Sequence, residues 1–140
     1  MDNYMELHLP AESKNEAFAR NVIAAFCVEL NPTVDEIDDV KTVISEAVTN
    51  CIVHAYPEKS GEITLRAQID GNILHMEVED YGVGIADIEK AKQPFFTSKP
   101  NEERSGMGFT IMESFMDELE IVKNDHGGTT VKLSKNFCID

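Results

Sequence analysis

The chain has 140 residues, the usual size of one domain, and we expect residues 1–140 to share a single hydrophobic core. Asp and Glu outnumber Lys and Arg by 26 to 12, so the formal net charge is −14. That charge repels phosphate backbones and anionic lipid, which argues against direct nucleic-acid or membrane binding. The acidity serves either solubility alone or an acidic docking surface, and the composition leaves both open.

The three cysteines, Cys27, Cys51 and Cys138, are odd in number and far apart, which favours neither a disulfide framework nor a zinc site. Cys27 and Cys51 fall in apolar helical stretches, so we expect them to be buried and unreactive. No basic and apolar leader and no apolar run of membrane-spanning length is evident. We therefore expect a soluble protein in the reducing cytoplasm.

A strand and two helices are predicted in the first part of the chain. Apolar and polar residues alternate over 5–9, as in a half-buried strand. Capping-box patterns predict helices over 13–30 and 33–56, the second ending before Pro57. The two patterns are Ser13 with Glu16 and Thr33 with Glu36.

Two alternating stretches, 63–69 and 74–78, predict strands joined by a two-residue turn at Asp70-Gly71. Further along, the sequence predicts a short helix, a long functional loop, another helix and a last hairpin turned at Gly127-Gly128. The short helix is expected over 85–92, the loop over 93–104 and the next helix over 106–116. The two strands of the hairpin are expected over 119–123 and 129–133. The fold class is then α/β, a two-layer sandwich with a mixed, mostly antiparallel sheet and helices packed on one face.

On the second helix, Glu46, Asn50 and His54 recur at one-turn spacing along one face. Such a row is commonly only a solvated face. Here no Lys or Arg interrupts it, and apolar residues border it. Carboxylate and amide oxygens are the hard ligands and proton acceptors that a magnesium phosphate site uses.

The stretch Asp80-Tyr81-Gly82-Val83-Gly84 directly follows a predicted strand. Asp80 has the parity of the strand's apolar residues, so its carboxylate should face the covered side of the sheet. A buried carboxylate needs a donor, which an exocyclic amino group such as that of adenine would supply. The alternative is an ordinary turn after a strand.

The stretch Ser105-Gly106-Met107-Gly108-Phe109 lies at the start of a predicted helix. Free N–H groups and the helix dipole make such a terminus an anion site. Lys90, Lys99 and Arg104 bring positive charge to the adjacent loop, although loop solubility explains these charges almost as well.

Four patterns in this sequence together resemble the nucleotide-binding fold of the GHKL superfamily, which includes gyrase, heat-shock chaperone ATPases, histidine kinases and mismatch-repair ATPases. The patterns are Glu46-x-x-x-Asn50, Asp80-x-Gly82-x-Gly84, Gly106-x-Gly108 and Gly128-Thr129-Thr130. A P-loop and a kinase catalytic loop are absent from the sequence.

Three longer stretches narrow the resemblance to the anti-sigma F factor family of endospore-forming bacteria: 15–20, 45–50 and 104–113. The resemblance extends from Met5 to about Leu133. Cys51 stands where the family commonly has Ala, and Ser98 where a second Thr is usual.

The resemblance implies a protein-serine kinase that uses ATP and Mg²⁺. Glu46 would be the catalytic base and Asn50 the metal ligand, while Asp80 would read adenine. The residues implied in nucleotide binding are Asn50, His54, Asp80, Gly82, Gly84, Thr97, Arg104, Ser105, Gly106, Met107, Gly108, Phe109 and Thr130.

The resemblance also implies partners: the sporulation sigma factor F, which the chain would inhibit, and the anti-anti-sigma factor, which would supply the phosphorylated serine. Glu16 and Arg20 would dock them, although their spacing alone favours a plain intrahelical ion pair. We expect a homodimer. The alternative is a non-catalytic module of the same fold in which ATP only stabilises the partner-binding form; a histidine kinase would need a separate phosphoacceptor domain.

Overall fold

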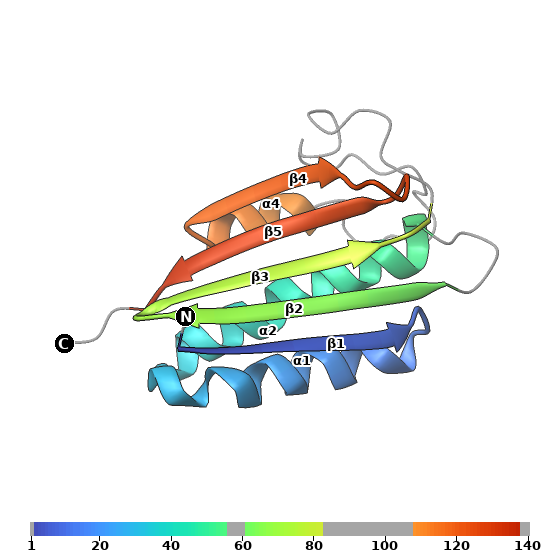
Figure 1. The fold of residues 1–140 in the computed structure, drawn as a ribbon. Coiled ribbons are helices and arrows are strands. Elements are labelled where there is room, and N and C mark those ends of the chain that lie inside the picture. The colour runs from blue at the N-terminus through green and yellow to red at the C-terminus, as the bar shows by residue number, and fades with distance from the viewer. Residues whose placement is uncertain (1, 56–60, 83–107, 138–140) are drawn as a thin grey trace.

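The structure is a computed structural model that describes residues 2–55, 61–82 and 108–137, with only the backbone at His54 and Ala55. One five-stranded sheet forms the first layer, and the helices cover one of its faces as the second layer (Figure 1). This arrangement confirms the expected two-layer α/β sandwich.

The strands are ordered β1-β2-β3-β5-β4 across the sheet, so the last strand of the chain lies between β3 and β4. All four pairings are antiparallel, and the mixed character that we expected does not occur among the described strands. The strand bounds are β1 Asn3–Pro10, β2 Glu62–Asp70, β3 Ile73–Asp80, β4 Glu118–Lys123 and β5 Thr129–Asn136.

The predicted helices are confirmed where the structure describes them. Their bounds are α1 Lys14–Phe26 with a 3₁₀ turn at Cys27–Leu30, α2 Val34–Asn50 with a π-helical segment at Cys51–Ala55, and α4 Gly108–Phe115. α2 packs between α1 and α4 behind the sheet (Figure 1).

The start of α2 forms as its sequence pattern predicts. Glu36 N–H donates to Thr33 Oγ1 at 3.1 Å, and Thr33 N–H donates to Glu36 Oε1 at 2.9 Å. This reciprocal capping box satisfies two N–H groups that the first turn of a helix leaves without partners.

The capping box predicted at Ser13 is wrong, because it does not form. Ser13 itself has helical dihedrals, φ −55° and ψ −33°, and its side chain makes no capping bond. The Glu16 carboxylate, which should have bonded back to Ser13, instead accepts from Arg20 Nη1 at 3.1 Å. A capping residue needs an extended backbone to turn its oxygen towards the helix, and Ser13 does not have one.

The hairpin between β2 and β3 is shifted by one residue from the predicted turn. Asp70 pairs with Ile73, so the two-residue loop is Gly71-Asn72 rather than Asp70-Gly71. Gly71 has φ +61°, and glycine at the first loop position is the requirement of a II′ hairpin.

The core lies between the sheet and the helices and is built by strict alternation along the strands. In β3, Leu74, Met76 and Val78 are at most 1% exposed, whereas the intervening residues are more exposed. Cys27 and Cys51 are buried free thiols, as we expected. Within the described ranges no helix is long and apolar enough to cross a membrane.

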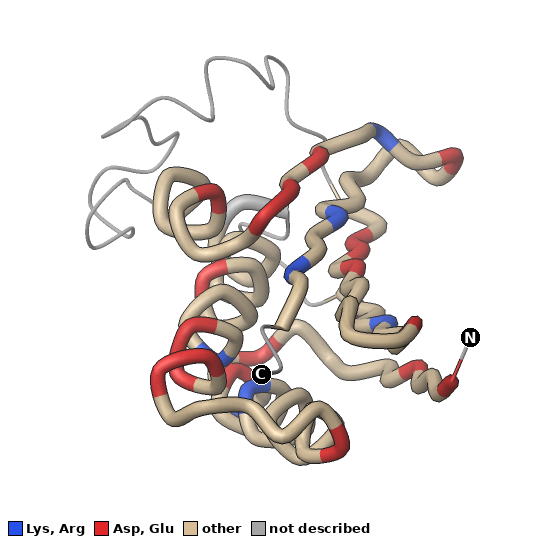
Figure 2. The backbone as a smooth tube through the Cα atoms, turned by 90° about the vertical axis from the view of Figure 1, so that its left-hand side faces the viewer, with Lys and Arg blue, Asp and Glu red and all other residues tan. Residues whose placement is uncertain are grey.

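The opposite face of the sheet is polar. Arg66 on β2 lies within 4 Å of carboxylates from both neighbouring strands: its Nε is 3.4 Å from Glu6, and its Nη1 is 3.8 Å from Glu77. Exposed pairs of this kind contribute about 0–1 kcal/mol each. Acidic positions are present on the helices as well as on the strands (Figure 2).

Candidate functional site

Glu46 and Asn50, one turn apart on α2, both lie against the first described residue of α4. A Cβ placed on Gly108 would lie 3.3 Å from Glu46 Oε2 and 3.2 Å from Asn50 Nδ2. A larger residue here would press on both side chains and require them to shift by a few tenths of an ångström. The structure thus brings together two segments that the sequence singled out separately, at the helix terminus expected to face an anion.

The side chain of Asn50 indicates that the position beside Gly108 suits a polar ligand. Its Nδ2 is buried and has no hydrogen-bond partner in the part of the chain that the structure describes. A buried donor without an acceptor costs about 1–3 kcal/mol, so a phosphate oxygen here would be favourable. An amide beside a carboxylate also suits a phosphate that carries a divalent cation.

A metal ion at this place would need ligands from elsewhere. The described residues contain no group of three or more His, Cys, Asp or Glu able to hold a metal. Mg²⁺ typically takes one or two protein ligands together with substrate phosphates and water. The Asn50 environment therefore fits a cation that arrives with a nucleotide.

Asp80 ends β3 with its carboxylate towards the helices, as its parity in the strand predicts. It is 5% exposed. Its Oδ1 accepts from Thr129 N–H at 3.1 Å and from Gly82 N–H at 3.2 Å. Its Oδ2 faces the Cys51 thiol at 3.8 Å, which links Asp80 to the residue that follows Asn50.

The pKa of Asp80 is raised because burial removes water from the carboxylate. Backbone hydrogen bonds from Thr129 and Gly82, and the bond from the Cys51 thiol, act in the opposite direction but do not cancel the effect of burial. A buried carboxylate with one oxygen held by the backbone is poised to accept a hydrogen bond from a ligand donor.

The turn between β4 and β5 clamps the end of β3. Asn124 Nδ2 donates to the carbonyl oxygen of Asp80 at 2.8 Å. A Cβ on Gly128 would collide with that oxygen and would lie 2.6 Å from Asp80 Oδ1, so only glycine permits this approach. The sequence placed Gly128 in a turn and in the family pattern, but it did not predict this contact with Asp80.

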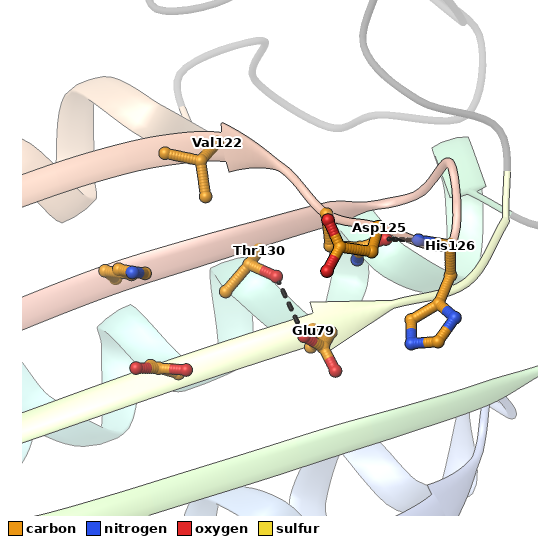
Figure 3. A pocket seen from close by; sticks show the side chains of 8 residues that line it. Glu79, Val122, Asp125, His126 and Thr130 are labelled. Atoms are coloured by element: carbon orange, nitrogen blue, oxygen red, sulfur yellow. Dashed lines mark hydrogen bonds between the residues drawn. The ribbon is translucent and has the colours of Figure 1, made fainter.

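Thr130, which we expected in the nucleotide pocket, lies on the other face of the sheet. It pairs with Glu79 rather than with Asp80. Its hydroxyl donates to Glu79 Oε2 at 3.1 Å (Figure 3). The structure therefore does not bring the side chain of Thr130 to Asp80.

Thr129, rather than Thr130, lies beside Asp80. It has the parity of the buried Val131, it is 3% exposed, and its N–H bonds Asp80. Its Oγ1 is buried without a partner among the described residues. The alternation of β5 could have identified Thr129 from the sequence, because Val131 and Leu133 show which parity faces the core.

A shallow cavity of about 230 Å³ lies on the open face of the sheet (Figure 3). It is on the side of Thr130 and Glu79, away from Asp80, and so it is distinct from the candidate nucleotide site. Its lining residues are Glu77, Glu79, Val122, Asn124, Asp125, His126, Thr130 and Lys132.

Among the remaining expected site residues, some lie in the described part of the chain and the others lie outside it. Phe109 packs against the hydrophobic core, and Glu16 pairs with Arg20 on α1. His54 follows Asn50 in the π-helical segment, so the α-helical spacing of the predicted row holds only as far as Asn50. Outside the described residues lie Gly84, Thr97, Arg104, Ser105, Gly106 and Met107, together with the helix expected over 85–92 and the loop expected over 93–104.

The chain is similar to known proteins both in sequence and in fold. The profile of the histidine kinase-like ATPase domain matches residues 9–135. The fold is similar to a crystal structure of the RsbU and RsbW domains of a Mycobacterium tuberculosis protein, with a TM-score of 0.70 and 22% identity. That match covers 96% of this chain and 32% of the other chain.

Three full-length relatives carry the name anti-sigma F factor. The Thermoanaerobacter sp. protein is 56% identical, over 99% of this chain and 96% of its own. The protein of Geobacillus stearothermophilus is 52% identical, over 99% of this chain and 95% of its own. That of Clostridium acetobutylicum is 50% identical, over 99% of this chain and 97% of its own. The chain therefore belongs to the anti-sigma F factor family and to the histidine kinase-like ATPase domain family.

Proposed function

We propose that the chain is a protein-serine kinase and anti-sigma factor: it binds and inhibits the sporulation sigma factor F and uses Mg-ATP to phosphorylate a serine of the anti-anti-sigma factor. One observation carries the kinase part of the proposal. The Glu46 carboxylate and the Asn50 amide meet at Gly108, which begins α4 among the described residues. Family membership supports the sigma factor and the antagonist as partners, and we propose that the protein acts as a homodimer.

In the proposed reaction, Glu46 accepts the proton of the attacking serine hydroxyl. The serine oxygen bonds to the γ-phosphorus while the bond to the β-phosphate oxygen breaks, and ADP leaves. Asn50 would hold the metal and the phosphates in place. The magnesium ion would neutralise charge on the phosphates. Asp80 accepts a hydrogen bond from the exocyclic amino group of adenine, because Oδ1 is held by the backbone and Oδ2 faces only the Cys51 thiol among the described groups. Thr129, whose hydroxyl has no partner among the described residues, would contact the base.

The direct test incubates the full chain with γ-labelled ATP, Mg²⁺ and the anti-anti-sigma protein. We expect label on a serine of that partner, and none on it when Mg²⁺ is removed by a chelator. ATP binding without any serine label would favour the alternative, a module of the same fold in which ATP only stabilises the partner-binding form.

Reversing the charge of Arg20 should remove partner binding and spare nucleotide binding. Arg20 Nη1 lies 3.1 Å from Glu16, and the two side chains are 37% and 24% exposed. Arg20→Glu replaces an attractive pair by two carboxylates one turn apart, which together costs about 0.4–1 kcal/mol and leaves the fold intact. We expect sigma factor affinity to fall by at least about tenfold, as for an interface anchor, with an unchanged ATP dissociation constant.

Lys14→Glu is the matched control, because it makes the same charge change on the same helix at a side chain that is 76% exposed. It should bind the sigma factor nearly as the parent protein does. A parallel loss of sigma factor and ATP binding in Arg20→Glu would show a folding defect and would remove Arg20 from the docking surface.

A further inference from the structure

The two carboxylate oxygens of Asp80 have different surroundings. Oδ1 accepts from two backbone N–H groups, those of Thr129 and Gly82. The Cys51 thiol, at 3.8 Å, is the hydrogen-bond donor that reaches Oδ2 among the described residues. The backbone therefore fixes one oxygen, while a single side chain orients the other.

The Cys51 thiol lies where it can donate a hydrogen bond to Asp80. It sits at the junction of α2 and the π-helical segment, and it is 4% exposed. A cysteine thiol is protonated at neutral pH and is a weak S–H donor. At 3.8 Å from Asp80 Oδ2, the sulfur can donate to that oxygen.

A second observation indicates that a ligand belongs beside this pair. Thr129 is 3% exposed, shares the covered face of the sheet with Asp80, and has a buried Oγ1 without a partner among the described residues. A carboxylate oxygen with one weak donor and a hydroxyl with none offer hydrogen-bonding capacity that the described protein groups leave unused.

We propose that Cys51 is a positioning residue for Asp80, and that its thiol holds Oδ2 in the orientation that accepts the exocyclic amino group of a 6-aminopurine nucleotide. The inference rests on the proposed function, in which Asp80 contacts adenine. A carboxylate oxygen has two lone pairs, so Oδ2 can accept from the thiol and from the amino group together. Cys51 then affects discrimination at the purine 6-position without touching the phosphates.

The test compares the dissociation constants of two nucleotides for the full chain with Mg²⁺. One is ATP, and the other is purine riboside triphosphate, which has the same phosphates but lacks the 6-amino group. Cys51→Ala should weaken ATP about three- to tenfold, the size of one hydrogen bond, and leave the analogue unchanged. Cys51→Ser, which returns a donor, should restore most of the affinity for ATP.

Cys27→Ala is the matched control, because Cys27 is a fully buried thiol on the 3₁₀ turn after α1. It should lower stability without changing the ratio of the two dissociation constants. An equal loss of both nucleotides in Cys51→Ala would overturn the inference and leave Cys51 with a packing role only.

Asp80→Asn separates the failure of the inference from the failure of the proposed function. In the parent protein ATP should bind more tightly than the analogue, and Asp80→Asn should abolish that preference. If this holds while Cys51→Ala keeps the full preference, the inference alone is wrong. If the parent protein shows no preference, Asp80 does not contact adenine, and both the proposed role of Asp80 and the inference fall.

Discussion

Replacing Glu46 with Gln should lower the rate of phosphate transfer to the serine partner by about 10²- to 10⁴-fold, the usual contribution of a general base. Gln keeps the shape of Glu and its contact with Gly108, but its amide cannot take a proton from the serine hydroxyl. The ATP dissociation constant should therefore change little. Single-turnover transfer of labelled phosphate measures the first quantity, and calorimetric titration with ATP measures the second.

Asp38→Asn is the control for the loss of one negative charge from the same helix, because Asp38 is an exposed residue of α2. Its transfer rate should equal that of the parent protein. Unchanged transfer in Glu46→Gln would remove Glu46 from the role of base, and equal slowing in both variants would assign the effect to the net charge of the helix.

Gly128→Ala should destabilise the protein by about 3 kcal/mol, in the range of an overpacked core, and should also weaken ATP binding. The new Cβ would lie 2.8 Å from the carbonyl carbon of Asp80 and 2.6 Å from its Oδ1. Backbone atoms cannot rotate away as a flexible side chain can, so the end of β3 must shift. Urea denaturation measures the loss of stability, and titration measures the loss of ATP affinity.

Gly127→Ala is the neighbouring control, because nothing lies within 4 Å of its added Cβ. Gly127 has φ +85°, so alanine there costs about 1–2 kcal/mol of backbone strain but does not press on Asp80. Its ATP affinity should be unchanged. Equal losses of ATP affinity in the two variants would contradict the direct contact between Gly128 and Asp80.

Local sequence patterns were sufficient for most of the fold. The alternation of 74–78 predicted a half-buried strand, and the direction of Asp80 followed from its parity. Thr33 and Glu36 predicted the start of α2, because a capping box depends on atoms three residues apart. The similar pattern at Ser13 failed, because Ser13 has helical dihedrals and the Glu16 carboxylate pairs with Arg20.

The sequence predicted only part of the candidate site. The row of Glu46 and Asn50 was found by helical spacing, but the place of Gly108 beside both depends on the packing of α4 on α2. Thr129 was missed because Thr130 was assigned from the family resemblance, whereas the parity of Val131 and Leu133 directs Thr129 towards the core.

The sequence by itself determined the elements, their apolar faces and the types of group that a nucleotide needs, because these depend on neighbours within one turn or one strand. Tertiary structure alone decided the order β3-β5-β4, the contact of Cys51 with Asp80 and the close approach of Gly128 to that residue. These contacts join residues 29 and 48 positions apart, which no local periodicity encodes. Only the packing of helix on sheet and strand on strand brings them together.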